Sequence, residues 1–422
     1  MRTETMRNTY IIIPLKTTGE INLKTYSIKN SEELGFDSES MSDLIRHKCS
    51  KDQGFVRRFR LQWEAISVNF ADGFSVPVKD IQLTAFENGI GFLSVLFCVK
   101  ESDIKRIYNF VNPGYLTGKD EDLQQIFIND IRQKVLSGTG FDIYVEGENK
   151  ALAIKESYLF NAAFVDYRFD ELPELEQATF NVHKILGVDE NIVDESEADI
   201  AYTFGGRDVE NRTYRWGCCI SSQSISFVYG PGNSNYNAEA KTAIRPASDF
   251  SIEEMINAAE DDILLTLLAL YQRFTCMMLA ETIQRRMRKE GGGQKAIREL
   301  KSEVMRFRAY DTLTPFQISR WNNVCETYRY LLEMNGVQEA LDNVAENIDL
   351  INEEMERIES RRESYFTTII AVFGLTSIVA SVQQITDYIL QGESTVMLWT
   401  KISFVGLAAL GVAYIIMNRR KK

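Results

Sequence analysis

Apolar residues follow two different periods along this chain. Up to about residue 245, short runs rich in β-branched and aromatic residues alternate with helical spacings, a pattern typical of an α+β domain. The predicted strands cover residues 10–15, 89–100, 163–168, 213–221 and 224–229, and the predicted helices cover residues 102–109 and 121–136. From residue 251 onward the spacing predicts helices only. We therefore expect an α+β domain over residues 1–245 and a helical region over residues 251–363.

The helical region contains start and stop signals. Ser251 and Glu254 have the spacing of a capping box, which predicts a helix start at that point. Thr314 stands before Pro315, a cap followed by proline at the first helical position, and this helix is expected to end near Asn335. Four helices are thus predicted, which begin near Ser251, Gln294, Pro315 and Val337.

The last of these helices carries an apolar seam. Its apolar residues stand three and four positions apart, with charged residues between them: Leu341, Val344, Ile348, Ile351, Met355 and Ile358. This heptad pattern predicts that parallel copies of the chain associate about a common axis. An amphipathic helix packed on its own domain gives the same pattern, and that alternative stays open.

Two long uncharged stretches follow the seam, at residues 364–386 and 402–418. A bilayer core of about 30 Å needs roughly 20 apolar residues in a helix. We therefore predict transmembrane helices over residues 364–390 and 396–418, in contact with membrane lipid. A helical hairpin buried in a soluble core is the alternative. The apolar run at residues 263–270 is too short to span a bilayer and is expected in the core.

Basic residues flank the two predicted spans. Arg361 and Arg362 precede the first span, and Arg419, Arg420, Lys421 and Lys422 follow the second. Basic flanks favour the cytoplasmic side, so both termini are expected in the cytoplasm. The sequence therefore predicts a multi-pass protein of the cell inner membrane, and the scattered cysteines fit a reducing compartment.

Composition narrows the chemistry. The net charge of −13 argues against direct nucleic-acid binding. The chain has only two histidines and no CxxC pair, so we expect no metal-ligating set for zinc. It also has no Walker A loop, GxSxG or HExxH, so we predict no catalytic residues and no enzyme.

The order of these parts resembles the CorA family of metal-ion transporters. The segment YFTTIIAVF at residues 365–373 is similar to the family's entry into its first membrane helix, and Leu375-Thr376 is similar to the part that follows. The resemblance covers residues 250–422. It implies a homopentamer whose first membrane helix lines an ion pore.

One departure from the family changes the expected function. The family closes its first membrane helix with a Gly-Met-Asn signature that selects hydrated magnesium, whereas residues 382–386 here read VQQIT. In this respect the chain is more similar to the CorA-like membrane effectors found beside type III CRISPR systems. That resemblance implies an oligomeric channel in antiviral defence, gated by a nucleotide second messenger such as S-adenosylmethionine–AMP or a cyclic oligoadenylate. A divalent-cation transporter and a non-conducting membrane-tethered scaffold are the alternatives.

Two segments combine residue types that suit a nucleotide. Phosphate and adenosine need basic and aromatic side chains near flexible backbone. The first segment starts with Phe204-Gly205-Gly206, and the second is a basic patch that includes Arg60. The predicted ligand-binding residues are Arg207, Asp208, Arg212, Arg215 and Trp216 in the first segment and Arg57 and Arg58 in the second. A tight turn and a solvated basic face are the alternatives.

Polar side chains recur on the first predicted membrane helix. Amide side chains are costly in lipid, so they should face a bundle interior or water. The predicted pore-lining residues are Thr376, Ser377, Ser381, Gln383, Gln384 and Asp387. Hydrogen bonding between helices is the alternative role for this stripe.

Overall fold

The computed structural model describes residues 6–70, 73–100, 103–111, 118–144, 157–167, 169–184, 200–205, 214–230, 250–288, 294–391, 399 and 402. The chain forms two compact units. The first unit combines Met1–Arg288 with Ser302–Val344, and the second combines Lys289–Lys301 with Ala345–Lys422.

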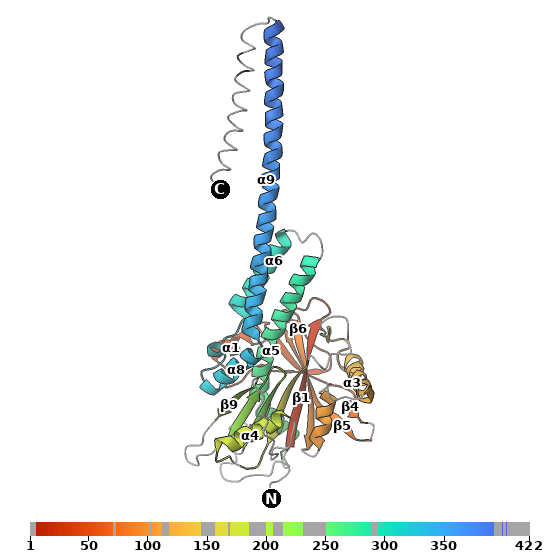
Figure 1. Ribbon diagram of the computed structural model, residues 1–422. Helices are drawn as coiled ribbons and strands as arrows, with labels where there is room; N and C mark the ends of the chain where they lie inside the picture. The colour runs from red at the N-terminus through yellow and green to blue at the C-terminus, as the bar shows by residue number, and fades with distance from the viewer. Residues whose placement is uncertain are drawn as a thin grey trace. The chain divides into compact units, whose positions relative to one another are not determined.

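The first unit is built on a mixed sheet of 11 strands (Figure 1). Nine of them follow the order β2-β3-β5-β6-β1-β8-β11-β10-β9, while β4 pairs with β5 and β7 pairs with β1. The strands are β1 (Met6–Thr17), β2 (Ser31–Leu34), β3 (Val56–Leu61), β4 (Ser67–Asn69), β5 (Ser75–Phe86), β6 (Ile90–Lys100), β7 (Phe141–Ile143), β8 (Tyr158–Phe164), β9 (Ala201–Gly205), β10 (Trp216–Ile220) and β11 (Ser224–Tyr229). Among these pairings β8 and β11 are parallel and the others are antiparallel.

The central strand β1 shows how the sequence suits its position. Its run of isoleucines is buried, as expected for a strand covered on both faces. Pro14 has no backbone N–H to donate to a neighbouring strand. On this side of β1 the pairing with β8 ends at Ile12 and the pairing with β7 begins at Leu15. Pro14 therefore stands in the gap between these two partner strands. A proline is therefore tolerated in a central strand here.

Helices cover both faces of this sheet. On one face, α2 (Ile104–Val111), α3 (Gly118–Asp130) and a π-helical turn at Ile131–Val135 pack on the inner strands, and α4 (Leu172–His183) packs on β8, β10 and β11. On the other face lies α5 (Ile252–Arg288), where Tyr271 stacks on Phe86 with 4.4 Å between ring centroids. Leu83 and Ala85 of β5 point to the face opposite Phe86, as the two-residue period of a strand requires. Their side chains belong to the hydrophobic core under α2 and α3.

The remaining helices are short until the last one. They are α1 (Asp43–Lys48), α6 (Gln294–Arg306), a π-helical turn at Phe307–Asp311, α7 (Pro315–Ile318), α8 (Asn322–Met334) and α9 (Val337–Gln391). The prediction of one helix from Pro315 to Asn335 is wrong, because Ser319 is extended with φ −150° and ψ 161°. Its hydroxyl donates to the backbone oxygen of Ser40, and that bond holds the break between α7 and α8.

Most of the other predicted elements are present. The α+β class, the strand at Ser224–Tyr229 and the start of α9 at Val337 are confirmed. The capping box is confirmed as well, since the Ser251 N–H donates to Glu254 at 2.8 Å and the Glu254 N–H donates to Ser251 at 3.1 Å. The prediction of a strand at residues 163–168 caught only the end of β8.

Two described helices are long and apolar enough to cross a membrane. The first, Ile252–Arg285, is 78% buried over its apolar window and so is a core helix, which confirms the expectation for residues 263–270. The second, Glu363–Gln384, belongs to α9 and has none of its apolar window buried. Apart from Trp399 and Ile402, the predicted span at residues 396–418 lies outside the described residues.

The seam of α9 is divided in the structure. Leu341, Val344 and Ile348 are each 3% exposed within a single chain, so the first part of the seam is occupied by the chain's own packing. Ile351 is half-buried, and the side chains of Met355 and Ile358 lie outside the described ones. Burial of the first part supports the alternative of packing on its own chain for that stretch.

Candidate functional site

Several neighbouring strands of the sheet begin or end at the same level, and we call this end of the strands the loop end. The pairing registers place Met6 opposite both Lys100 and Phe164, and Phe164 opposite Tyr229. Trp216 lies opposite both Tyr229 and Gly205. The ends of six strands therefore meet where the predicted nucleotide segment leaves β9 and returns on β10.

The backbone at the loop end is held by a short ladder of bonds. The Arg215 N–H donates to the Gly205 carbonyl at 3.3 Å, and the Gly230 N–H donates to the Arg215 carbonyl at 2.8 Å. The Tyr214 N–H donates to the Phe169 carbonyl at 2.9 Å. These bonds fix the main chain on both sides of Arg215, whose half-buried side chain brings a positive charge to the loop end.

Gly205 has a packing role that the sequence did not reveal. A Cβ at this position would lie 1.9 Å from Cε2 of Trp216, so the indole occupies the space that any larger residue would need. The same ring lies 6.0 Å from Phe227, centroid to centroid. Glycine is therefore required at the end of β9 because an aromatic ring rests against its backbone.

The structure places part of the predicted nucleotide segment. Arg215 and Trp216 stand side by side at the start of β10, both half-buried. Arg207, Asp208 and Arg212 lie outside the described residues. Arginine and tryptophan are residue types that bind the phosphate and stack on the base of an adenosine nucleotide. As consecutive residues at the start of a strand, these two point to opposite faces of the sheet, and the indole packs on Gly205.

The second predicted segment has a different character. Arg57 donates to the Leu23 carbonyl at 2.9 Å and pairs with Glu33 at 2.6 Å. Arg58 is bonded to Glu260 and Gln82, and its side chain is 0% exposed. The interpretation of a basic solvated patch is therefore wrong for these two residues, since their own chain neutralises and covers them.

The described part of the first segment, Arg215 and Trp216, lies far from the second segment. Arg57 and Arg58 lie on β3, and five strands separate β3 from β10, which carries Trp216. Neighbouring strands are about 4.8 Å apart, so the distance across the sheet is about 29 Å. A single nucleotide bound at the loop end would not contact both segments.

Titratable groups gather between α5 and the sheet. The Tyr229 hydroxyl donates to Asp262, and burial raises the pKa of that carboxyl to about 7, with a smaller contribution from the nearby charge of Asp261. Burial also raises the pKa of Tyr10 well above its usual value, and Asp80 and Glu260 add to the effect. α5 therefore contacts the sheet through the carboxyl groups of Glu260 and Asp262, beside buried apolar side chains such as Met255 and Ile263.

We expect Asp262→Asn to reduce the loss of stability of the first unit as pH rises. An unfolded aspartate loses its proton near pH 4, but folded Asp262 keeps its proton up to about pH 7. The folded form therefore loses stability between these two values, by an upper bound of about 4 kcal/mol. The measurement is the thermal unfolding midpoint at pH 5 and pH 8, with Asp349→Asn as an exposed control. An identical pH dependence in wild type and Asp262→Asn would show that this carboxyl is not the source.

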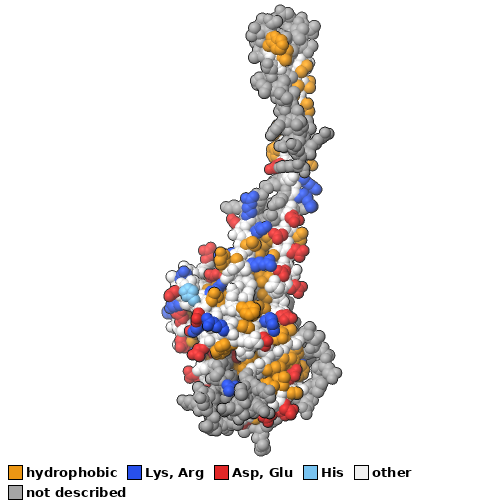
Figure 2. Space-filling model, turned by 90° about the vertical axis from the view of Figure 1, so that its left-hand side faces the viewer, with side chains coloured by type: hydrophobic (Ala, Val, Ile, Leu, Met, Phe, Trp, Pro, Cys, Tyr) orange, Lys and Arg blue, Asp and Glu red, His pale blue; other side chains and the backbone are white. Residues whose placement is uncertain are grey.

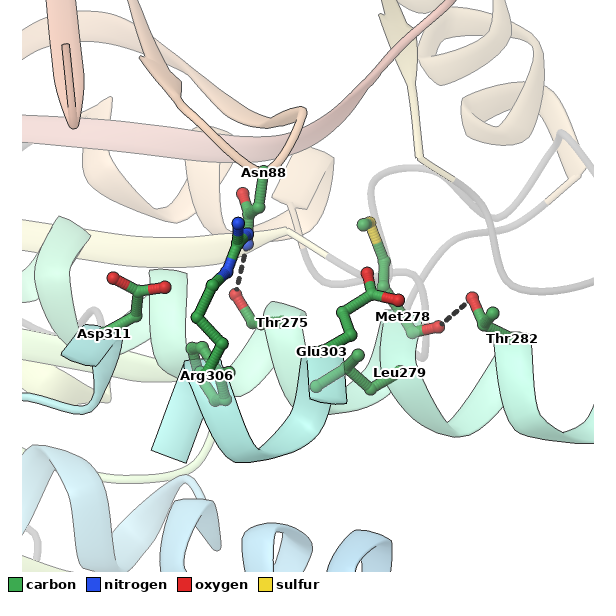
Figure 3. Close-up of a pocket in the computed structure, with 9 residues that line it drawn as sticks. Asn88, Thr275, Met278, Leu279, Thr282, Glu303, Arg306 and Asp311 are labelled. Atoms are coloured by element: carbon green, nitrogen blue, oxygen red, sulfur yellow. Dashed lines mark hydrogen bonds between the residues drawn. The ribbon is translucent and has the colours of Figure 1, made fainter. Parts of the chain in front are cut away.

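A small hollow lies between the β5–β6 turn, α5 and the segment from α6 to the following π-helical turn (Figure 3). Asn88 donates to the Thr275 hydroxyl at 2.9 Å, and Asp311 pairs with Lys48 at 3.1 Å. Glu303 and Arg306 also line it. Its volume of about 50 Å³ is far below the roughly 300 Å³ of pockets that enclose drug-sized ligands. It has room for water or a single ion but not for a nucleotide.

The predicted pore residues all belong to α9. Ser377, Gln383 and Gln384 are exposed in the single chain. The side chains of Thr376, Ser381 and Asp387 lie outside the described ones, although their backbone is helical. In the described part of the chain, no group of three His, Cys, Asp or Glu side chains is placed to hold a metal ion.

Sequence reasoning missed the contacts that join these elements. Arg273 on α5 reaches both the β10–β11 turn and the end of α8, and Glu260 on α5 reaches β3. Comparison with known proteins adds no assignment, since no protein-family model and no curated protein matches this chain.

Proposed function

We propose that this protein is a membrane-anchored oligomeric channel or effector whose first unit responds to a nucleotide ligand. The observation that carries the proposal is the exposed apolar stretch of α9. The stretch spans 22 residues, Glu363–Gln384, and none of the apolar window within it is buried. A soluble chain does not leave such a surface in water, because its transfer out of water is strongly favourable.

The side chains of this stretch suit a bilayer. Large apolar residues are exposed along this stretch, among them Tyr365, Phe366, Ile370, Phe373 and Val379. In Figure 2 the described side chains there are orange or white, whereas many on the preceding part of α9 are red. Between Val337 and Arg357 every charged residue is acidic. The change from charged to apolar marks the level at which α9 would enter the membrane.

The polar groups at the start of the stretch are satisfied within the helix. The Thr367 hydroxyl donates to the Glu363 carbonyl at 2.7 Å, and the Thr368 hydroxyl donates to the Ser364 carbonyl at 2.7 Å. Such bonds to the preceding turn lower the cost of a hydroxyl in lipid. Tyr365 and Phe366 stand at the same level, where aromatic residues are enriched in membrane proteins.

A continuous helix supports the link between ligand and membrane. α9 begins in the first unit at Val337 and continues without a break to Gln391. In this proposal α9 passes a displacement of its first turn on to the part that enters the lipid. Gating would then require that the ligand bind the open and closed states with different affinity.

The ligand class follows from the loop end. Arg215 and Trp216 offer one guanidinium and one indole at the edge where the strands end, which favours a nucleotide with an exposed phosphate. The probes chosen are S-adenosylmethionine–AMP and cyclic oligoadenylates, the messengers that the resemblance to CorA-like effectors implies. The expected setting is the inner membrane, with the first unit in the cytoplasm and the assembly a homopentamer.

The test measures binding and flux on the full chain. Arg215→Ala should weaken nucleotide binding about tenfold or more, since a bond to a charged group contributes roughly 1.5–3 kcal/mol. Binding is measured by calorimetry, and ion flux is measured in proteoliposomes with each nucleotide. Arg320→Ala, an exposed arginine on the α7–α8 connection, is the matched control. Magnesium uptake without any nucleotide binding would favour a divalent-cation transporter, and neither activity would favour a scaffold.

A further inference from the structure

The β10–β11 hairpin has two ends with different neighbours. Its open end, at Trp216 and Tyr229, belongs to the loop end of the sheet. Its closed end is the turn from Ser221 to Ser224, closed by a Ser221 N–H bond to the Ser224 carbonyl at 2.9 Å. The strands rise about 3.3 Å per residue, so roughly 15 Å separates the two ends. Five paired positions, from Trp216 opposite Tyr229 to Ile220 opposite Ile225, connect the two ends.

The closed end contacts a single arginine of α5. Nη1 of Arg273 donates to the Ser222 carbonyl at 2.8 Å and to Oδ1 of Asn335 at 2.7 Å. One guanidinium nitrogen therefore serves two acceptors on two different elements. The Tyr158 hydroxyl repeats the connection, since it donates to the Ser221 carbonyl at 3.1 Å and also bonds to Asn335.

Asn335 occupies the joint between α8 and α9. α8 ends at Met334 and α9 begins at Val337, so only Asn335 and Gly336 connect them. Asn335 also donates from Nδ2 to the Leu331 carbonyl at 2.8 Å, which closes the last turn of α8. Gly336 has φ +60°, a conformation that other residues adopt only at a cost. The direction of α9 is set at these two residues.

We infer that Arg273 is the positioning residue that couples the β10–β11 hairpin to the α8–α9 joint. The role of this coupling in gating rests on the proposed function, whereas the contacts that make the coupling do not. A ligand at the loop end that displaced the hairpin would move the Ser222 carbonyl. Arg273 would either follow it and pull on Asn335 or lose one of its two acceptors. Both responses act on the two residues that set the start of α9.

The coupling is tested by disturbing one end of the hairpin and observing the joint. Trp216→Ala removes the indole at the open end, and Gly205→Ala displaces it by adding a Cβ to its site; each is made in the full chain with and without Arg273→Ala. Hydrogen exchange of residues 340–346 is measured in detergent without ligand. Either disturbance should raise exchange there at least threefold when Arg273 is present and less than half as much when Arg273 is alanine, because Tyr158 still connects the turn to Asn335. Arg329→Ala, on α8 near the joint, is the control background and should preserve the response.

Two results would overturn the inference. The first is an equal response at residues 340–346 with and without Arg273, and the second is no response in the wild-type background. Because no nucleotide is added, a failure of the proposed ligand leaves this test intact. Where a nucleotide does bind, Arg273→Ala should change its affinity less than twofold and lower the evoked ion flux at least tenfold. Unchanged flux would also refute the coupling.

Discussion

Replacing Glu260 by alanine should destabilise the first unit by about 3 kcal/mol, because it removes the carboxylate from a buried guanidinium. The Arg58 side chain is 0% exposed, and Glu260 is 31% exposed at the rim of the same contact. Removing one partner of a buried pair typically costs 3–5 kcal/mol. Partial exposure of Glu260 and the second partner Gln82 place this pair at the lower limit of that range. The measurement is the thermal unfolding midpoint of the detergent-solubilised protein.

A matched control separates burial from charge. Lys301 and Asp349 form an ion pair at 3.0 Å, but their side chains are 40% and 65% exposed. Exposed pairs contribute about 1 kcal/mol or less, so Asp349→Ala should have a small effect. The double variant Arg58→Met with Glu260→Met should recover most of the loss, since the guanidinium is then no longer buried without its carboxylate. Equal losses for Glu260→Ala and Asp349→Ala would refute the role of burial.

The same pair shows why part of the site escaped sequence analysis. Arg57, Arg58 and Arg60 look like a basic patch because a sequence shows their spacing but not their partners. Arg58 finds its carboxylate 202 positions later, on a helix that packs across the sheet. Local pattern contains no information on such a pairing. The same limit applies to Arg273, which acts on a backbone carbonyl and on an asparagine that looks like an ordinary helix end.

Elements that are stabilised by contacts between residues close in sequence were predicted well. The strand β11 was predicted at its observed bounds and β10 within the range 213–221, because both segments are rich in aromatic and β-branched residues or bounded by serines and a glutamine. The capping box at Ser251 was predicted because its two bonds connect residues three apart. The break between α7 and α8 was missed because a distant backbone oxygen, that of Ser40, stabilises it. The parallel pairing of β8 with β11 was equally invisible, since α4, β9 and β10 lie between them in the chain.

Arginine at both Ile370 and Phe373 should prevent stable membrane insertion of α9. Both side chains are exposed in an uncharged stretch, and Phe373 is 69% exposed. An arginine near the centre of a span costs about 2.5–3.5 kcal/mol on the insertion scale, so the pair would cost roughly 5–7 kcal/mol. That cost competes with the burial of the remaining apolar residues in lipid. We expect the double variant to leave the membrane fraction or to be degraded, whereas the wild type sediments with membranes and needs detergent.

The control for this prediction lies on the same helix. Leu350 is also exposed, at 56%, but it stands among acidic residues before the uncharged stretch begins. Leu350→Arg therefore adds the same charge at a level that stays in water, and it should leave fractionation unchanged. If α9 instead buried its apolar stretch against protein, the wild type would be soluble without detergent. The two arginines would then disturb a protein contact and not membrane insertion. A wild-type chain recovered in the soluble fraction would thus remove the membrane anchor, and with it the route by which the first unit would act on a pore.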